Sequence, residues 1–155
     1  MVTLTEGEDT LVDLLNELIE LDYDAIEAYR AAVGRAEDLR DRARVSTFLD
    51  DHERHVQDLA ALVRELGGEP AGAGDLRQIL TKGKVVIGGL FGDRLVLEAM
   101  KANEAETTAA YERAAALEDL PGRARALFER HLADERRHHD WIVERLDSAE
   151  GLLRL

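Results

Sequence analysis

Four stretches of the chain place apolar residues at alternating steps of three and four, the spacing that brings side chains onto one face of a helix. The positions on these faces are, in chain order, Leu11, Leu15, Leu18, Ala25 and Tyr29; Val45, Phe48, Leu59, Leu62 and Leu66; Leu97, Met100, Thr107, Tyr111 and Ala114; and Ala124, Phe128, Ile142 and Leu146. We therefore predict four long helices, each of which buries one face.

The boundaries of these helices are marked by residues that start or stop helical structure. Thr5 and Glu8 have the spacing of a capping box at the start of the first helix. Gly67 and Gly68, with Pro70 close behind, are typical of a helix end and indicate where the second helix stops. The fourth helix is expected to end near residue 148.

The connections between the helices are short, long and short. Brief turns are expected at residues 34–38 and 118–122, and they make the joined helices antiparallel neighbours. Between them, residues 69–92 hold six glycines and a short helical pattern at 75–80. A connection of that length can run from one end of a bundle to the other. The prediction is an all-α fold of one domain over residues 1–155, a four-helix bundle with one long crossover between helices two and three.

Each predicted helix interrupts its apolar face once, near its middle, with ionisable residues. The interrupting residues are Asp22 on the first helix, His52 and His55 on the second, Glu104 on the third, and His131, Glu135 and His138 on the fourth. Tyr29 and Tyr111 lie seven residues after Asp22 and Glu104, and we expect their hydroxyls to bond to these polar groups.

The turns indicate that these interruptions lie at one level. In an antiparallel hairpin, residues equidistant from the turn face each other. The midpoint of positions 22 and 52 is 37, inside the first turn, and that of 104 and 135 is 119.5, inside the last. Each position is about 15 residues from its turn, or roughly 22 Å along the helix. The four interruptions should therefore form one polar layer across the bundle.

Such a layer needs compensation, because an unpaired charged group buried in a protein costs several kcal/mol. Mutual hydrogen bonds between carboxylates and imidazoles are one solution, and a bound cation is another. Pairs spaced by three residues project two ligands from one helix toward one point, as bundle metal sites require. The candidate metal ligands are Asp22, His52, His55, Glu104, Glu135 and His138. His131 is expected to lie beside the ligands. Asp51 and Glu53 lie off the buried face, although a rotation of the helix would bring one of them into the site.

Composition narrows the chemistry further. The absence of cysteine excludes thiolate zinc sites and iron–sulfur clusters, which leaves histidine and carboxylates as the strong ligands. A formal net charge of -13 argues against nucleic-acid partners. The longest apolar stretch, residues 85–91, contains two glycines and is too short to span a membrane. The N-terminal residues are polar and unlike a signal peptide, so we expect a cytoplasmic protein.

The second half of the chain resembles the ferritin, bacterioferritin and rubrerythrin superfamily. Glu104 precedes Tyr111 by seven residues, and Glu135 and His138 form the Glu-x-x-His pair of that superfamily. The run at residues 134–141, DERRHHDW, is similar to the fourth helix of bacterioferritins. The resemblance implies a ferritin-like bundle with a metal centre.

The first half departs from the same pattern. Asp22, seven residues before Tyr29, stands where the superfamily has glutamate, and His55 falls at the position of its histidine. His52 replaces the glutamate that would bridge two irons. The stretch Leu14–Pro70 looks most similar to the DUF2383/PA2169 type of bacterial ferritin-like family.

Two functions are compatible with this resemblance. One is a metal-binding protein, with iron as the first candidate and manganese or zinc as alternatives, and with ferroxidase or peroxide-related redox activity. The other is a non-enzymatic helical bundle that serves in stress response or as a scaffold and keeps a degenerate metal site. By analogy with the superfamily, a homodimer is expected.

Overall fold

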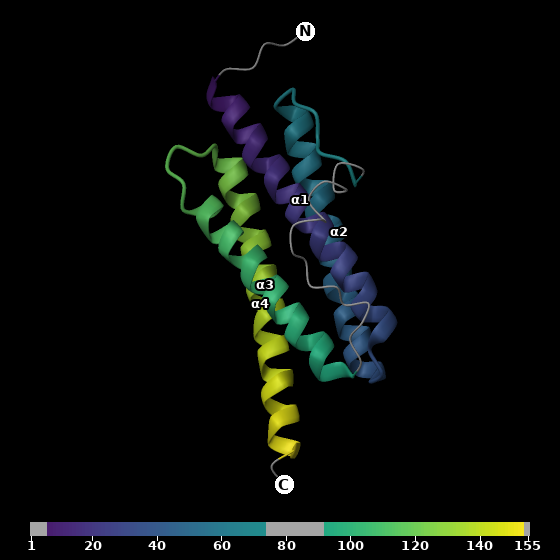
Figure 1. Ribbon diagram of the computed structural model, residues 1–155. Helices are drawn as coiled ribbons and strands as arrows, with labels where there is room; N and C mark the ends of the chain where they lie inside the picture. The colour runs from purple at the N-terminus through teal and green to yellow at the C-terminus, as the bar shows by residue number, and fades with distance from the viewer. Residues whose placement is uncertain (1–5, 74–91, 154–155) are drawn as a thin grey trace.

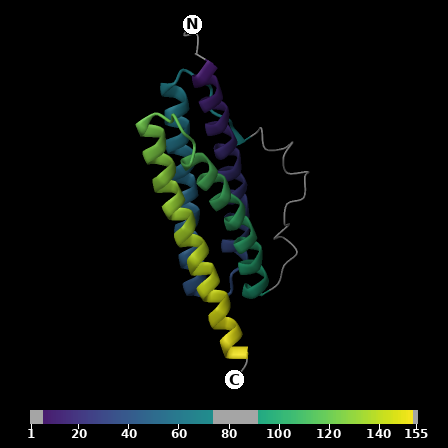
Figure 2. The ribbon, with the colours of Figure 1, turned by 90° about the vertical axis from the view of Figure 1, so that its left-hand side faces the viewer.

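The computed structural model describes residues 6–73 and 92–153, and these form four α-helices joined as the sequence predicts. The helices are α1 (Glu6–Arg35), α2 (Leu39–Glu65), α3 (Asp93–Ala115) and α4 (Gly122–Leu153) (Figure 1). α1 and α2 form one antiparallel hairpin, and α3 and α4 form another (Figure 2). α1 also packs against α3, and α2 lies beside α4 with less direct packing. The predicted all-α four-helix bundle is confirmed.

Two predicted features lie outside the described residues. They are the short helix at 75–80 and the part of the capping box that Thr5 supplies. At its other end the chain differs from expectation, because α4 continues to Leu153 rather than ending near residue 148. No proline interrupts this stretch, and Gly151 falls in the last turn, where a glycine is tolerated. None of the helices within the described residues is long and apolar enough to cross a membrane.

The turn between α1 and α2 also anchors the start of α3. Asp38 caps α2 by accepting hydrogen bonds from the backbone N–H groups of Arg40 and Asp41, at 2.8 and 3.0 Å. The Asp93 carboxylate, at the start of α3, accepts bonds from the backbone N–H groups of Glu37 and Asp38, at 2.7 and 3.0 Å. α3 therefore begins beside the first turn, while α2 ends at the opposite end of the bundle (Figure 1).

The end of α2 depends on two glycines. Gly67 has a φ of 81°, a left-handed conformation that costs glycine little, and it turns the chain out of the helix. The N–H of Gly68 then bonds to the Val63 carbonyl oxygen at 2.9 Å. A Cβ at Gly68 would lie 2.8 Å from Cγ1 of Val12 on α1, so this turn packs directly on the first helix.

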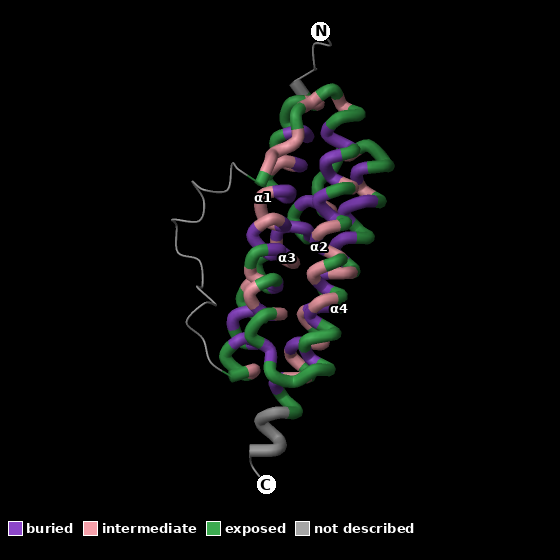
Figure 3. The backbone as a smooth tube through the Cα atoms, turned by 90° about the vertical axis from the view of Figure 1, so that its right-hand side faces the viewer, coloured by how far each residue is buried: buried purple, intermediate pink, exposed green. Residues whose placement is uncertain are grey.

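The core consists of two apolar clusters with polar side chains between them. One cluster gathers Leu15, Leu18, Ile19, Leu59, Val63, Leu127 and Phe128 with their neighbours, and the other gathers Ala25, Val45, Phe48, Met100 and Ile142 with theirs. Buried residues lie on the faces that the helices turn toward one another (Figure 3). Along every helix, the polar buried residues fall at or near the boundary between the two clusters, except for Asp41 near the start of α2.

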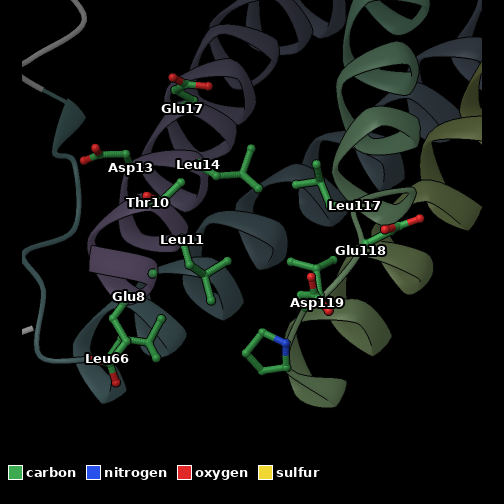
Figure 4. A pocket seen from close by; sticks show the side chains of 13 residues that line it. Glu8, Thr10, Leu11, Asp13, Leu14, Glu17, Leu66, Leu117, Glu118 and Asp119 are labelled. Atoms are coloured by element: carbon green, nitrogen blue, oxygen red, sulfur yellow. The ribbon is translucent and has the colours of Figure 1, made fainter. Parts of the chain in front are cut away.

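A surface pocket opens at the end of the bundle between the start of α1 and the turn that joins α3 to α4 (Figure 4). Leu11, Leu14 and Leu117 supply apolar lining, and Glu17 and Glu118 are among the acidic residues around them. None of the six candidate ligands lines this pocket. The chemistry of the polar layer is therefore separate from it.

Candidate metal centre

The structure brings all six candidate ligands together in the middle of the bundle. Asp22, His52, His55, Glu104, Glu135 and His138 each have a relative exposure of 0%. Their ligand-type atoms form two groups, and within each group the atoms lie within 4.8 Å of one another. We call these groups the first half-site (Asp22, His52, His55, Glu135) and the second half-site (His52, Glu104, Glu135, His138). The two half-sites share His52 and Glu135, an arrangement that is compatible with a di-metal site.

The first half-site is held together by contacts of Asp22 with two imidazoles. Asp22 Oδ1 lies 2.8 Å from His52 Nδ1 and 3.2 Å from His55 Nδ1. Glu135 Oε1 completes the group, 3.2 Å from His55 Nδ1 and 3.5 Å from His52 Nδ1. The nitrogens that face these carboxylates are thus the Nδ1 atoms of both histidines.

The second half-site is looser. Glu104 Oε1 lies 3.3 Å from His52 Nε2 and 3.5 Å from His138 Nδ1. Glu135 Oε2 is 4.0 Å from His138 Nδ1 and accepts a hydrogen bond from the Thr107 hydroxyl at 3.0 Å. The opposite nitrogens of His52 therefore face different half-sites.

The two tyrosines each bond to a carboxylate on the other hairpin, as expected. The Tyr111 hydroxyl donates to Asp22 Oδ2 at 2.5 Å, and the Tyr29 hydroxyl donates to Glu104 Oε1. Burial raises the pKa of each tyrosine well above its usual value, and the adjacent carboxylate raises it further. Both tyrosines therefore remain protonated donors that orient the carboxylates.

Two further carboxylates, which the sequence analysis missed as site residues, hold the outer nitrogens of the histidines. Asp134 Oδ2 lies 3.0 Å from His55 Nε2, and Asp51 Oδ2 lies 2.8 Å from His138 Nε2. Each bond crosses between α2 and α4. A carboxylate on one imidazole nitrogen fixes the tautomer and leaves the other nitrogen to act as a ligand. Here Nδ1 of both histidines is left facing the centre.

These outer carboxylates are joined by two arginines on the surface. Arg54 bonds to Asp51 at 3.1 Å and also to Asp134, and Arg137 bonds to the same two carboxylates at 2.6 and 3.1 Å. The signal for this arrangement is a repeated pattern, Asp-x-x-Arg-His, at residues 51–55 and 134–138.

His131 lies beside the centre but in neither half-site. Its ring stacks on that of His55 with centroids 3.9 Å apart. Its Nδ1 is 3.1 Å from the Tyr111 hydroxyl, and its Nε2 is 3.2 Å from Asp58 Oδ2. Burial and the charge of His55 lower its pKa to about 4, so it is neutral near pH 7. It packs behind the ligands, as the sequence indicated.

The electrostatics of the polar layer are strongly coupled. Burial alone would raise the pKa of Asp22, but hydrogen bonds from His52 and His55 lower it below its usual range. Burial likewise opposes charge on His55, yet its bonds to Asp134 and Asp22 raise its pKa to about 10. Burial raises the pKa of Glu135 to about 7, against the attraction of His52. Without a cation, the layer therefore relies on charged imidazoles to offset its carboxylates.

That internal pairing is incomplete. Glu104 Oε2, Glu135 Oε1 and His138 Nδ1 are buried and make no hydrogen bond of good geometry within the described residues, although Glu135 Oε1 lies 3.2 Å from His55 Nδ1. A buried polar group without a partner costs about 1–3 kcal/mol. All three atoms belong to residues of the second half-site, and carboxylate and imidazole donors are those that bind iron, manganese and zinc. The side chains present thus fit a metal ion better than they fit one another.

The chain has a ferritin-like fold, and its buried carboxylate and histidine groups are compatible with a metal site. By sequence the chain belongs to the DUF2383 family, a domain of unknown function, whose profile matches residues 10–117. The matched range includes α1, α2 and α3 but ends before Glu135 and His138. No curated protein sequence matches the chain.

Solved structures with the same fold come from several bacteria. The bacterioferritin-related protein of Bacteroides fragilis, described as a dodecameric thioferritin, superimposes with a TM-score of 0.81, covering 95% of this chain and 90% of its own at 16% identity. A Dps1 mutant of Mycobacterium smegmatis superimposes with a TM-score of 0.80 at 15% identity, and the match covers 92% of this chain and 99% of the Dps1 chain. The bacterioferritin of Desulfovibrio desulfuricans, which has a diiron site, superimposes with a TM-score of 0.78 at 23% identity. The match covers 94% of this chain and 82% of the bacterioferritin chain. At these identities the likeness shows the fold alone.

Proposed function

We propose that the protein binds two transition-metal ions in the polar layer, with iron as the first candidate and manganese or zinc as alternatives. The observation that carries the proposal is the pair of half-sites. In each of them four buried ligand residues converge, and three of their ligand-type atoms make no hydrogen bond of good geometry within the described residues. The ligands are Asp22, His52, His55, Glu104, Glu135 and His138. When bound, two irons would supply oxidation of Fe(II) by O2 or peroxide, with one electron from each ion.

The protein's own groups would hold and orient the ligands. Asp134 and Asp51 accept hydrogen bonds from the Nε2–H groups of His55 and His138, so that each Nδ1 is directed inward as a ligand. Tyr111 and Tyr29 donate to one oxygen of Asp22 and Glu104 and restrict their rotation. The two apolar clusters exclude water on either side, which strengthens the attraction between a cation and the carboxylates.

Metal analysis tests the proposal directly. Protein purified without chelators, and chelator-treated protein incubated anaerobically with Fe(II), Mn(II) or Zn(II), would be desalted and analysed for bound metal. We expect bound ions in the wild type and a marked loss in a Glu104→Gln, His138→Asn double variant. Glu112→Gln, on the exposed face of α3, is the matched control and should bind like the wild type. Wild-type protein that retains none of the three metals would overturn the proposal.

The redox part of the proposal has a separate test. Fe(II)-loaded protein exposed to O2 or peroxide should oxidise its iron faster than free Fe(II) in the same buffer, as followed by absorbance in the near ultraviolet. Iron oxidation should be as fast in the Glu112→Gln control as in the wild type, and no faster in the double variant than for free Fe(II) in buffer. Metal binding without accelerated oxidation would restrict the function to binding.

The proposal extends to assembly and location. One protein of this fold, the thioferritin of Bacteroides fragilis, is described as a dodecamer. We expect a homodimer here, which sedimentation of the purified chain would test. A cytoplasmic location is part of the same proposal and is tested by cell fractionation.

A further inference from the structure

The polar layer has an approximate twofold symmetry that is broken at its shared ligands. Asp22 and Glu104 are 82 positions apart, as are Tyr29 and Tyr111, and they occupy equivalent places on α1 and α3. The Asp-x-x-Arg-His runs on α2 and α4 are 83 positions apart, and the aspartate of each run bonds to the histidine of the other. Under this symmetry His52 is the counterpart of Glu135. One shared ligand is thus an imidazole and the other a carboxylate.

An imidazole and a carboxylate are not equivalent as shared ligands. A carboxylate offers lone pairs on both oxygens and can serve two ions at once. A neutral imidazole has one nitrogen with a lone pair, and its other nitrogen carries a proton. His52 can therefore complete one of the two half-sites, while Glu135 can contribute to both.

The contacts of His52 indicate which half-site it completes. Its Nδ1 lies 2.8 Å from Asp22 Oδ1, the shorter of its two hydrogen bonds, whereas its Nε2 lies 3.3 Å from Glu104 Oε1. When His52 keeps its proton on Nδ1, in the hydrogen bond to Asp22, a cation in the second half-site has to displace only the proton on Nε2, which leaves to solvent. The lone pair freed on Nε2 then faces the cation, and the shorter bond is preserved.

The unpaired atoms favour the same half-site. Glu104 Oε2 and His138 Nδ1 belong to the second half-site alone, whereas Glu135 Oε1 faces His55 in the first half-site. An ion in the second half-site therefore gains two ligand atoms, Glu104 Oε2 and His138 Nδ1, that have no hydrogen bond of their own. An ion in the first half-site has to disrupt the contacts of Asp22 with His52 and His55.

From these observations we propose that the two half-sites are unequal: the second half-site, completed by His52 Nε2, retains one ion tightly, and the first half-site binds a second ion weakly and exchanges it. This inference rests on the proposed metal binding. It assigns the two ions different behaviour, one a resident ion and the other an exchangeable ion. His52 is the residue responsible for the difference.

Two equivalent substitutions test the assignment. Chelator-treated wild type, Asp22→Asn and Glu104→Gln would be titrated with Co(II) by isothermal calorimetry, with the Co(II) absorption spectrum recorded at each addition. In the wild type we expect a first ion at least about tenfold tighter than the second, a gap of about 1.4 kcal/mol. Glu104→Gln should abolish the tight step, and Asp22→Asn should retain it and lose the weak one. The proposal is also supported if the wild type binds only one ion tightly, and this ion is lost in Glu104→Gln and kept in Asp22→Asn.

Several results would overturn it. Two wild-type sites of equal affinity, or a tight step that is lost in Asp22→Asn and kept in Glu104→Gln, would contradict the unequal half-sites while leaving metal binding intact. No Co(II), Fe(II), Mn(II) or Zn(II) binding by the wild type would refute both the metal function and this inference. Circular dichroism identifies a variant that fails to fold.

A crystal grown with one equivalent of Co(II) provides a measurement that needs no variant. Its anomalous scattering should place the ion beside Glu104 and His138, and a peak beside Asp22 and His55 would refute the assignment. A His52→Glu variant then tests the cause. With two carboxylates shared between the half-sites, the affinity of the weaker ion should rise and the gap should narrow. An unchanged gap would show that His52 is not its origin.

Discussion

Replacing Tyr111 with phenylalanine removes one oxygen from the centre of the bundle and leaves its shape intact. The hydroxyl donates to Asp22 Oδ2 at 2.5 Å, and its oxygen lies 3.1 Å from Nδ1 of His131. Both partners are buried, so no solvent replaces the lost contacts. A hydrogen bond to a charged group contributes about 1.5–3 kcal/mol to stability. For a chain of this size we expect the melting temperature of metal-free Tyr111→Phe to fall by about 3–12 °C.

Differential scanning calorimetry of chelator-treated protein measures this fall, and the chain supplies two matched comparisons. Tyr29→Phe breaks the equivalent bond to Glu104 and should cost a similar amount. Tyr23 is partly buried, and no hydrogen bond of its hydroxyl is seen within the described residues, so Tyr23→Phe should change stability by less than about 0.5 kcal/mol. If Tyr111→Phe has the same melting temperature as Tyr23→Phe, the Tyr111 hydroxyl does not stabilise Asp22 and our account of the polar layer is wrong.

Three other predictions concern packing, a buried ion pair and pH. Gly68→Ala should destabilise by about 1–3 kcal/mol in urea unfolding, since its Cβ would overlap Val12; an unaltered midpoint would contradict the tight packing. Arg145 Nε donates to the buried Asp41 carboxylate at 2.8 Å, and Arg145→Met leaves that carboxylate without this partner. The substitution should lower the free energy of unfolding by about 1–3 kcal/mol in the same assay, and Arg145→Lys should lower it less. The pKa of His55 is raised from its usual 6.5 to about 10 in the folded state, so the stability that it contributes is complete below the unfolded pKa and is lost as pH rises to the folded pKa. Metal-free protein should therefore lose stability between about pH 6.5 and 10, and His55→Asn should flatten that slope.

Much of the fold and the meeting of the six ligands could be inferred from spacing alone. The helix ends at Gly67 and near residue 118, together with the interruptions of the apolar faces, determine both the connectivity and the level of the polar layer. These inferences succeed because α-helices have a constant rise per residue and short turns force antiparallel pairing.

The outer carboxylates could not be found in the same way. Helical spacing tells which side chains share a face of their own helix, but not how far that helix lies from another. Asp51 and Asp134 reach histidines on the neighbouring helix, and that contact depends on the separation of α2 and α4. The partners of the two ring nitrogens of His52 could likewise not be predicted from the sequence, because they depend on the rotation of one ring.

The broken symmetry at His52 and Glu135 has a consequence for the ancestry of such a chain. A bundle made from two copies of one hairpin would carry the same residue at both central positions, because a symmetric pair repeats every side chain. An imidazole opposite a carboxylate becomes available once both hairpins are encoded in one polypeptide and each half accumulates its own changes. A single polypeptide thus permits a combination of ligands that self-association of one hairpin excludes.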